Sequence, residues 1–224
     1  MKTSKLLFQL ILLSFVLTVN AQEPEQDSGD YLEFNDRKSV VHGVYLGLNL
    51  AYGEIDGKDT YNPGIKIAYV ANQQFEVGFE AKFIYSEQNI FNAQNAVNED
   101  LIGGYAGLHL EPILFSKSLV NLSFPLLVGM GAVGYVDREA IKREEDVNLD
   151  ENSVALLFVA EPGVSALFNI NRYLQLEAGI KYRFSNKIDL ANSPVSRING
   201  FSAGIGIKVG VFNMGRNRYR KNVD

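Results

Sequence analysis

The chain contains 224 residues, with 20 glycines, six prolines and no cysteine, and it carries a formal net charge of −5 at pH 7. The absence of cysteine excludes disulfides, Cys-ligated metal sites and thiol nucleophiles, and the acidic balance argues against a nucleic-acid partner. Beyond residue 21 no apolar run approaches the roughly 18 residues of a spanning helix, so a membrane-embedded mature chain would have to be a closed barrel.

The first 21 residues have the pattern of an export signal. Two lysines precede a mainly apolar run over 6–17, and the small residues Val19 and Ala21 have the spacing that signal peptidase requires. The run is shorter than the roughly 20 residues of a transmembrane anchor. We therefore expect a signal peptide over 1–21 that is cleaved after Ala21, followed by an acidic periplasmic segment over 22–41.

Eight stretches of the mature chain alternate between apolar and polar residues. In the clearest of them, Leu174, Leu176 and Ile180 fall on one set of alternate positions, and Glu177 and Lys181 fall on the other. Period two gives a continuous apolar face on a strand but not on a helix. The pattern predicts strands over 44–52, 65–70, 75–85, 101–111, 120–136, 153–168, 173–184 and 200–212.

The connections between these strands alternate in length. Long polar segments over 53–61, 86–100, 137–152 and 185–199 alternate with shorter links over 71–74, 113–119 and 169–172. Bacterial outer-membrane barrels have long outer loops and short periplasmic turns in this arrangement. We therefore predict an all-β fold, an eight-stranded antiparallel up-and-down transmembrane β-barrel over 42–212. Both termini would lie in the periplasm, with a basic periplasmic tail over 213–224.

A soluble exported barrel also alternates, but it packs its apolar face inside. Two features favour the membrane instead. The polar face is rich in glycine, which suits the narrow interior of an eight-stranded barrel. Aromatic residues gather near strand ends, where membrane barrels have interfacial girdles: Tyr52, Tyr69, Tyr85, Tyr135, Phe168, Tyr182, Phe184 and Phe212. We therefore expect the protein to lie in the outer membrane of a Gram-negative bacterium. A soluble periplasmic lipid-binding barrel remains an alternative.

Two segments add a resemblance to this pattern. NLSFPLLVGMGAVGY and AEPGVSALFNINRYLQLEAGIKYRF, with the glycine-rich last strand, resemble the small outer-membrane β-barrel proteins of Bacteroidetes-type bacteria. That family shares the transmembrane architecture of OmpA and OmpX. The resemblance extends over about 41–212 as a pattern of strands. It implies fold and location, and it implies no shared activity.

Strand parity places ten charged side chains inside the barrel. They are Lys66, Glu76, Glu80, Lys82, Glu111, Glu161, Glu177, Lys181, Arg183 and Lys208. Because a buried charge is tolerated only with a partner and further hydrogen bonds, we predict that the five acids and five bases form a neutral network. Such a network would plug the lumen, since eight strands enclose only enough room for their own side chains. The alternative is a narrow channel for ions or small solutes.

The predicted outer loops together carry a net charge of −8. We expect this acidic surface to meet outer-membrane lipid and lipopolysaccharide, with Ca²⁺ or Mg²⁺ as a bridge, since both ions prefer carboxylate oxygens. The segments 56–59 and 146–152 are candidate ligands, although neither follows an EF-hand loop and solvated turns are the simpler interpretation.

The chain offers little for catalysis. Its only histidines, His42 and His109, fall near the periplasmic end, whereas a surface hydrolase needs its base among the outer loops. We therefore predict no enzyme, no catalytic residue, no resident metal and no cofactor. The expected role is structural or adhesive, for a monomer whose outer loops contact an unidentified extracellular ligand.

The long hairpin allows a prediction of register. Symmetric closure makes paired residue numbers sum to about 289, which places Pro125 opposite Val164 and Leu127 opposite Pro162. Each proline removes a donor from the hydrogen-bond ladder, so a bulge or kink is expected at this level.

Overall fold

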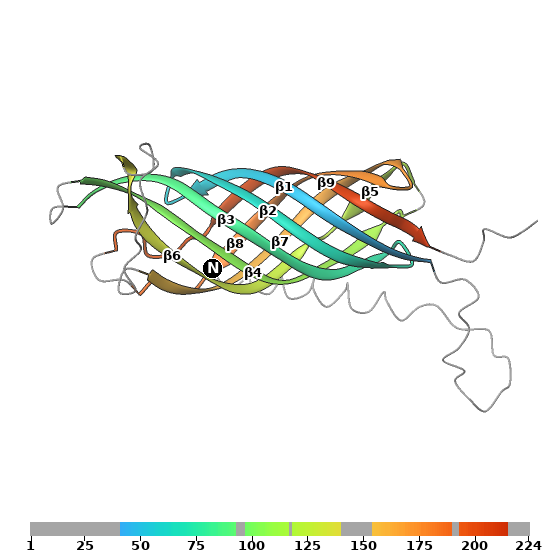
Figure 1. The fold of residues 1–224 in the computed structure, drawn as a ribbon, viewed down its shortest axis with the longest axis horizontal. Coiled ribbons are helices and arrows are strands. Elements are labelled where there is room, and N and C mark those ends of the chain that lie inside the picture. The colour runs from blue at the N-terminus through green and yellow to red at the C-terminus, as the bar shows by residue number, and fades with distance from the viewer. Residues whose placement is uncertain (1–40, 93–96, 117, 140–153, 190–192, 215–224) are drawn as a thin grey trace, which may run out of the picture. The chain divides into compact units, whose positions relative to one another are not determined.

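The described part of the chain is an antiparallel barrel. The computed structural model describes residues 41–92, 97–116, 118–139, 154–189 and 193–214. In these residues the strands are β1 (His42–Ile55), β2 (Lys58–Ala71), β3 (Phe75–Asn92), β4 (Val97–Leu114), β5 (Val120–Ser123), β6 (Leu126–Asp137), β7 (Val154–Asn171), β8 (Leu174–Ser185) and β9 (Gly200–Met214). β1 to β4 pair in order, β5 and β6 each pair with β4 and β7, β7 to β9 pair in order, and β1 also pairs with β9, which closes the ring (Figure 1). Because β5 and β6 share one place, the ring has eight members, and the predicted fold is confirmed.

The alternation of side chains has the predicted sense. Along β1, Leu46, Leu48 and Leu50 are 49 to 60 % exposed on the outer wall, whereas Tyr45 and Ala51 are buried inside. Apolar residues cover the outside of the other strands in the same way, and charged residues point inward. A soluble barrel would have the opposite arrangement, because its outer wall must face water. The wall of this barrel faces hydrocarbon, so the barrel is a transmembrane one.

The two ends of the barrel differ in their connections. β1 begins and β9 ends at the same end, where the short links after β2, β4 and β7 also lie (Figure 1). In outer-membrane barrels that end faces the periplasm. We call it the periplasmic end and the opposite one the outer end.

Two of the four expected outer loops are strand instead. β1 and β2 run on to a two-residue turn at Asp56 and Gly57, both with positive φ (53° and 73°). A turn of this kind is favoured by Asp-Gly and continues the twist of the flanking strands. Likewise β3 extends to Asn92 and β4 begins at Val97, so the expected loop over 86–100 is mostly hairpin. The prediction of long loops at 53–61 and 86–100 was therefore wrong.

The register of the long hairpin differs from the prediction by one residue. Leu126 pairs with Pro162 and Val120 with Phe168, so paired numbers sum to 288. A sum of 289 was wrong because cross-strand partners must share a face, and it would pair an inward residue with an outward one. The ladder is interrupted at Phe124 and Pro125, the level at which a bulge or kink was expected. The register is the same on both sides, so the interruption inserts no extra residue.

The predicted signal peptide, most of the N-terminal segment and the tail over 215–224 lie outside the described residues. The described residues belong to one compact unit. Among the described residues, no helix is long and apolar enough to span a bilayer.

Candidate functional site in the barrel lumen

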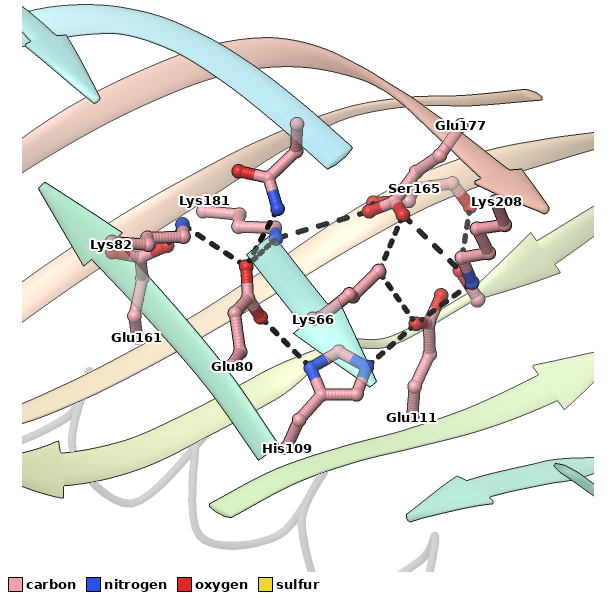
Figure 2. Close-up of polar contacts among 12 residues, drawn as sticks. Lys66, Glu80, Lys82, His109, Glu111, Glu161, Ser165, Glu177, Lys181 and Lys208 are labelled. Carbon is pink, nitrogen blue, oxygen red and sulfur yellow. Dashed lines mark hydrogen bonds and ion pairs between the residues drawn. The ribbon is translucent and has the colours of Figure 1, made fainter. Parts of the chain in front are cut away.

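All ten of the predicted charged side chains lie on the inner face of the barrel. Nine are buried and Lys181 is partly buried. They come from β2, β3, β4, β7, β8 and β9. Figure 2 labels eight of them, all but Glu76 and Arg183, converging on the interior of the barrel. The glycines make room for them: a Cβ on Gly47 would lie 2.7 Å from Cγ of Lys66, and one on Gly163 would lie 2.6 Å from Cγ of Lys181.

Five of these residues form what we call the inner cluster: Lys66, Glu76, Glu111, Glu177 and Lys208. Lys208 Nζ lies 2.9 Å from Glu76, 3.1 Å from Glu111 and 3.8 Å from Glu177. Lys66 Nζ lies 2.6 Å from Glu177 and 3.5 Å from Glu111. Two ammonium groups thus neutralise two of three carboxylates, which leaves the cluster with a net charge of −1.

Tyr45 on β1 completes the inner cluster. Its hydroxyl donates a hydrogen bond to Glu76. Its ring centroid lies 5.0 Å from Lys208 Nζ and 5.9 Å from Lys66 Nζ, within the range of a cation–π contact. The hydroxyl of Tyr45 therefore stabilises the carboxylate of Glu76, and its ring stabilises the two ammonium groups.

The outer cluster consists of Glu80, Lys82, Glu161 and Lys181. Lys82 pairs closely with Glu161, which also accepts a hydrogen bond from the Tyr105 hydroxyl. Lys181 Nζ is held more loosely, 3.7 Å from Glu80, and 3.8 Å from Glu177 of the inner cluster. Two acids and two bases make this cluster neutral.

His109 joins the two clusters. Its Nδ1 lies 3.0 Å from Glu80, and its Nε2 lies 2.9 Å from Glu111 (Figure 2). A neutral imidazole has only one N–H, so it can donate to just one of the two carboxylates. The imidazolium form can donate to both, and its charge would cancel the −1 of the inner cluster. His109 therefore links the clusters, in addition to the looser contact of 3.8 Å between Lys181 and Glu177.

Arg183 is inward and buried, but it stands outside the ion-pair network. Its Nε donates to the Ile198 carbonyl at 2.7 Å, and one terminal nitrogen donates to the Asn62 side chain at 2.8 Å. Within the described residues, no carboxylate lies within ion-pair distance of its guanidinium. Nine of the predicted ten side chains therefore take part in ion pairs, and Arg183 instead holds the segment that enters the barrel from the outer end.

Three apolar side chains of that segment are buried at the outer end of the lumen. The link between β8 and β9 was expected to be a polar outer loop, yet Ile188, Val195 and Ile198 are 0 to 3 % exposed. They pack with inward residues of five strands, among them Ile55 and Leu101. The link is also tied by the Ser185 hydroxyl, which accepts from the backbone N–H of Ile198 at 3.0 Å. We call these three side chains the apolar cap.

The periplasmic end is open by comparison. A vestibule of about 490 Å³ lies there, with Gln175 and Glu76 among its lining residues and Arg172 also contributing to its wall. Asn121, Asn169 and Gln175 form a chain of amide hydrogen bonds of 2.6 and 2.7 Å along its wall. Deeper in the barrel, a cavity of about 20 Å³ beside Lys181 has room for about one water molecule.

One group of side chains has the donors of a metal site. Ligand atoms of Glu76, His109 and Glu111 all lie within 4.8 Å of one another. Lys208, however, contacts both carboxylates at 2.9 to 3.1 Å. Its ammonium supplies the positive charge that an ion would bring, so these residues do not fit a resident metal.

The two predicted cation-binding segments have different outcomes. Asp56 forms the tight turn between β1 and β2, and Asp59 accepts a hydrogen bond from the Tyr52 hydroxyl at 2.5 Å. The segment 146–152 lies outside the described residues. Of the histidines, His42 is hydrogen-bonded to the Tyr69 hydroxyl at the periplasmic end, and His109 belongs to the lumen network.

Three elements of this site were not predicted from the sequence. Tyr45 and Tyr105 were not assigned as partners of the acids, although both fall on the inward parity. His109 was predicted near the periplasmic end but not between two carboxylates. The apolar cap was not predicted either, and its only signal was the set of isolated isoleucines and valine in an otherwise polar loop.

Comparisons with known proteins agree with this geometry at the level of fold. No protein family and no curated protein sequence matches the chain. Among solved structures, the chain resembles Neisserial surface protein A with a TM-score of 0.51 at 12 % identity, over 75 % of this chain and 96 % of that one. OprG from Pseudomonas aeruginosa (TM-score 0.37, 11 % identity, 76 % and 94 % coverage) and the outer-membrane enzyme PagL (0.36, 12 %, 73 % and 98 %) are more distant.

Proposed function

We propose that this protein is a non-conducting barrel of the bacterial outer membrane, with a structural or surface-interaction role. The observation that supports it best is the content of the lumen. Nine charged side chains form ion pairs in the middle of the barrel, and the apolar cap is buried at the outer end. Eight strands leave space only for their own side chains, so no continuous water path is expected.

The outer membrane is proposed from the combination of wall and fold. The apolar outer wall requires a bilayer, and β-barrels that are closed in this way belong to outer membranes. The resemblance to Neisserial surface protein A supports the architecture. Export by the predicted signal peptide would deliver the chain to that membrane.

The interaction surface is proposed at the outer end. There the hairpin of β3 and β4 extends past the end of β2, and Phe91 is 66 % exposed near its tip. Arg138 ties the base of this hairpin to the next one, with Glu87 at 3.0 Å and Asp100 at 3.5 Å. A braced projecting hairpin suits contact with lipopolysaccharide, through bridging Ca²⁺ or Mg²⁺, or with an extracellular ligand. No enzymatic role is proposed.

The decisive experiment is conductance. Purified barrel is inserted into planar bilayers at neutral pH, and the folded state is verified by heat-dependent migration on detergent gels. We expect no steady current above that of protein-free membranes. Fractionation with outer membranes tests the location independently of the lumen.

A narrow channel is the second candidate, because the periplasmic vestibule leads toward the loosely held Lys181 and its small cavity. Stable single-channel currents whose ion selectivity changes in Glu177→Lys would establish this channel and overturn the closed barrel. In a closed barrel the same substitution would reduce heat resistance, because it places an uncompensated charge in the inner cluster.

A further inference from the structure

The hydrocarbon-facing wall has a hollow that is not part of the lumen. It has a volume of about 710 Å³ and lies over β1, β9, β8, β7 and β5. Its lining includes the side chains of Leu48, Leu50, Phe168, Leu176, Ile205 and Ile207. All six of these point outward, so water does not compete for the hollow once the barrel is in a membrane.

Two neighbouring alanines create the hollow. Ala166 pairs with Ala178 across β7 and β8, and both are exposed on the outer wall. The next outward pair toward the outer end is Val164 and Ile180, and the next toward the periplasm is Phe168 and Leu176. At this level the outer surface of these two strands carries only two methyl groups, with larger side chains on either side. Such a notch is two strands wide, which suits a single hydrocarbon chain.

A cation lies at the periplasmic end of the same two strands. Arg172 is in the turn between β7 and β8, is exposed, and stacks on the ring of Tyr173 with 4.7 Å between its guanidinium carbon and the ring centroid. The backbone carbonyl of Tyr173 accepts from the N–H of Gly210 at 2.9 Å, which fixes the turn against β9. An aromatic ring beside an arginine is the usual anchor at a membrane interface, and arginine binds phosphate well.

The spacing of the two features matches one lipid molecule. Ala178 is five residues from Tyr173 along β8, which is roughly 13 Å along the membrane normal at about 3.4 Å per residue and a strand tilt of about 40°. The apolar band of an outer-membrane barrel is about 25 Å tall, so the alanines lie near its middle. An acyl chain whose headgroup sits at Arg172 would end in the hollow.

We propose that this wall is a binding site for a phospholipid of the periplasmic leaflet. Its phosphate contacts Arg172 and one acyl chain occupies the hollow over Ala166 and Ala178. The proposal rests on the membrane placement of the barrel and does not depend on whether the lumen conducts.

Native mass spectrometry of barrel extracted from outer membranes in a mild detergent tests this site. The unmodified protein should retain one phospholipid per barrel, and delipidated protein should take one up again from added phosphatidylethanolamine. Ala178→Leu fills the hollow and should reduce retention at least tenfold. Arg172→Gln should weaken it several-fold. Ala106→Leu is the matched control, since Ala106 is an exposed alanine on the opposite part of the wall between Ala81 and Met130, and it should retain lipid normally.

Three results would overturn the site. They are equal retention by Ala178→Leu and the unmodified barrel, retention of lipopolysaccharide in place of phospholipid, and association of two barrels through this face. Fractionation and heat-dependent migration of the same samples distinguish a failure of the membrane placement from a failure of the lipid site. A barrel absent from the membrane fraction contradicts the membrane placement, whereas a folded membrane barrel without bound phospholipid contradicts only the lipid site.

Discussion

Replacement of Lys208 by methionine tests whether the lumen is held by its ion pairs. Lys208 is fully buried and lies within 3.1 Å of Glu76 and Glu111. Methionine keeps much of the volume and removes the charge, so the net charge of the inner cluster falls from −1 to −2. Removal of one partner from a buried ion pair costs about 3–5 kcal/mol, because the remaining charge stays buried without compensation.

A loss of that size is readily measured. Since about 1.4 kcal/mol corresponds to a tenfold change in an equilibrium constant, the folding constant should fall by more than about 100-fold. The chain has no tryptophan, so the folded fraction is best followed by heat-dependent migration on detergent gels across a urea series. Lys58→Met, at an exposed lysine beside the tight outer turn, is the matched control and should leave the transition unchanged.

The double variant Lys208→Met with Glu76→Gln separates charge balance from packing. It removes one charge of each sign, and the Tyr45 hydroxyl can still donate to the amide oxygen of Gln at position 76. We expect it to recover much of the stability that Lys208→Met loses, as coupled neighbours do in a double-mutant cycle. If Lys208→Met unfolds at the same urea concentration as Lys58→Met, the ion pairs do not stabilise the lumen.

Three further predictions concern single positions. His109→Leu removes the imidazole from between Glu80 and Glu111, which keep their lysine partners, and should cost about 1–3 kcal/mol in the same urea assay, whereas an unchanged transition would show that the histidine does not link the clusters. Gly57→Ala should cost about 1 kcal/mol through its positive φ alone, since no atom of the described residues lies within 4 Å of the added Cβ, and Gly57→Asn should cost less. Ile198→Ala should cost about 2–4 kcal/mol by opening a cavity in the apolar cap, and a loss no larger than that of the lipid-facing Ile65→Ala would contradict the cap.

The faces of the strands could be predicted from the sequence because they depend only on local alternation. On a strand, residues i and i+2 share a side whatever lies across the sheet. Glu177 and Lys181 therefore had to lie inside once Leu176 and Ile180 were assigned to the wall. Alternation likewise placed all ten charges inside, and the eight alternating stretches predicted the eight-membered ring. An apolar outer wall is stable only against lipid, which predicted the membrane.

Strand ends were harder to predict because polar residues occur both in loops and in strands that project beyond a membrane. The Asp56-Gly57 pair is itself a signal for a tight turn, but the acidic residues around it also fit an open loop. The register of the long hairpin required the further condition that paired residues share a face. That condition requires an even sum, which excludes 289, and the structure has 288, with Leu127 opposite Glu161.

The tertiary structure alone decided which groups meet across the lumen. Lys208 contacts Glu76 over 132 positions of sequence, and Lys66 reaches Glu177 over 111, because closure of the ring brings opposite walls within the length of two side chains. Arg183 does not join this network, because the link between β8 and β9 lies at the outer end of the barrel, where the carbonyl of Ile198 accepts its hydrogen bond. The hollow at Ala166 and Ala178 likewise exists only when register sets the two small residues side by side. The sequence by itself determined which side of the wall each residue faces, because that is a property of one strand. The ion-pair partners, the closure of the ring and the lipid-facing hollow are properties of the whole barrel, because they depend on how far each strand is shifted relative to the next.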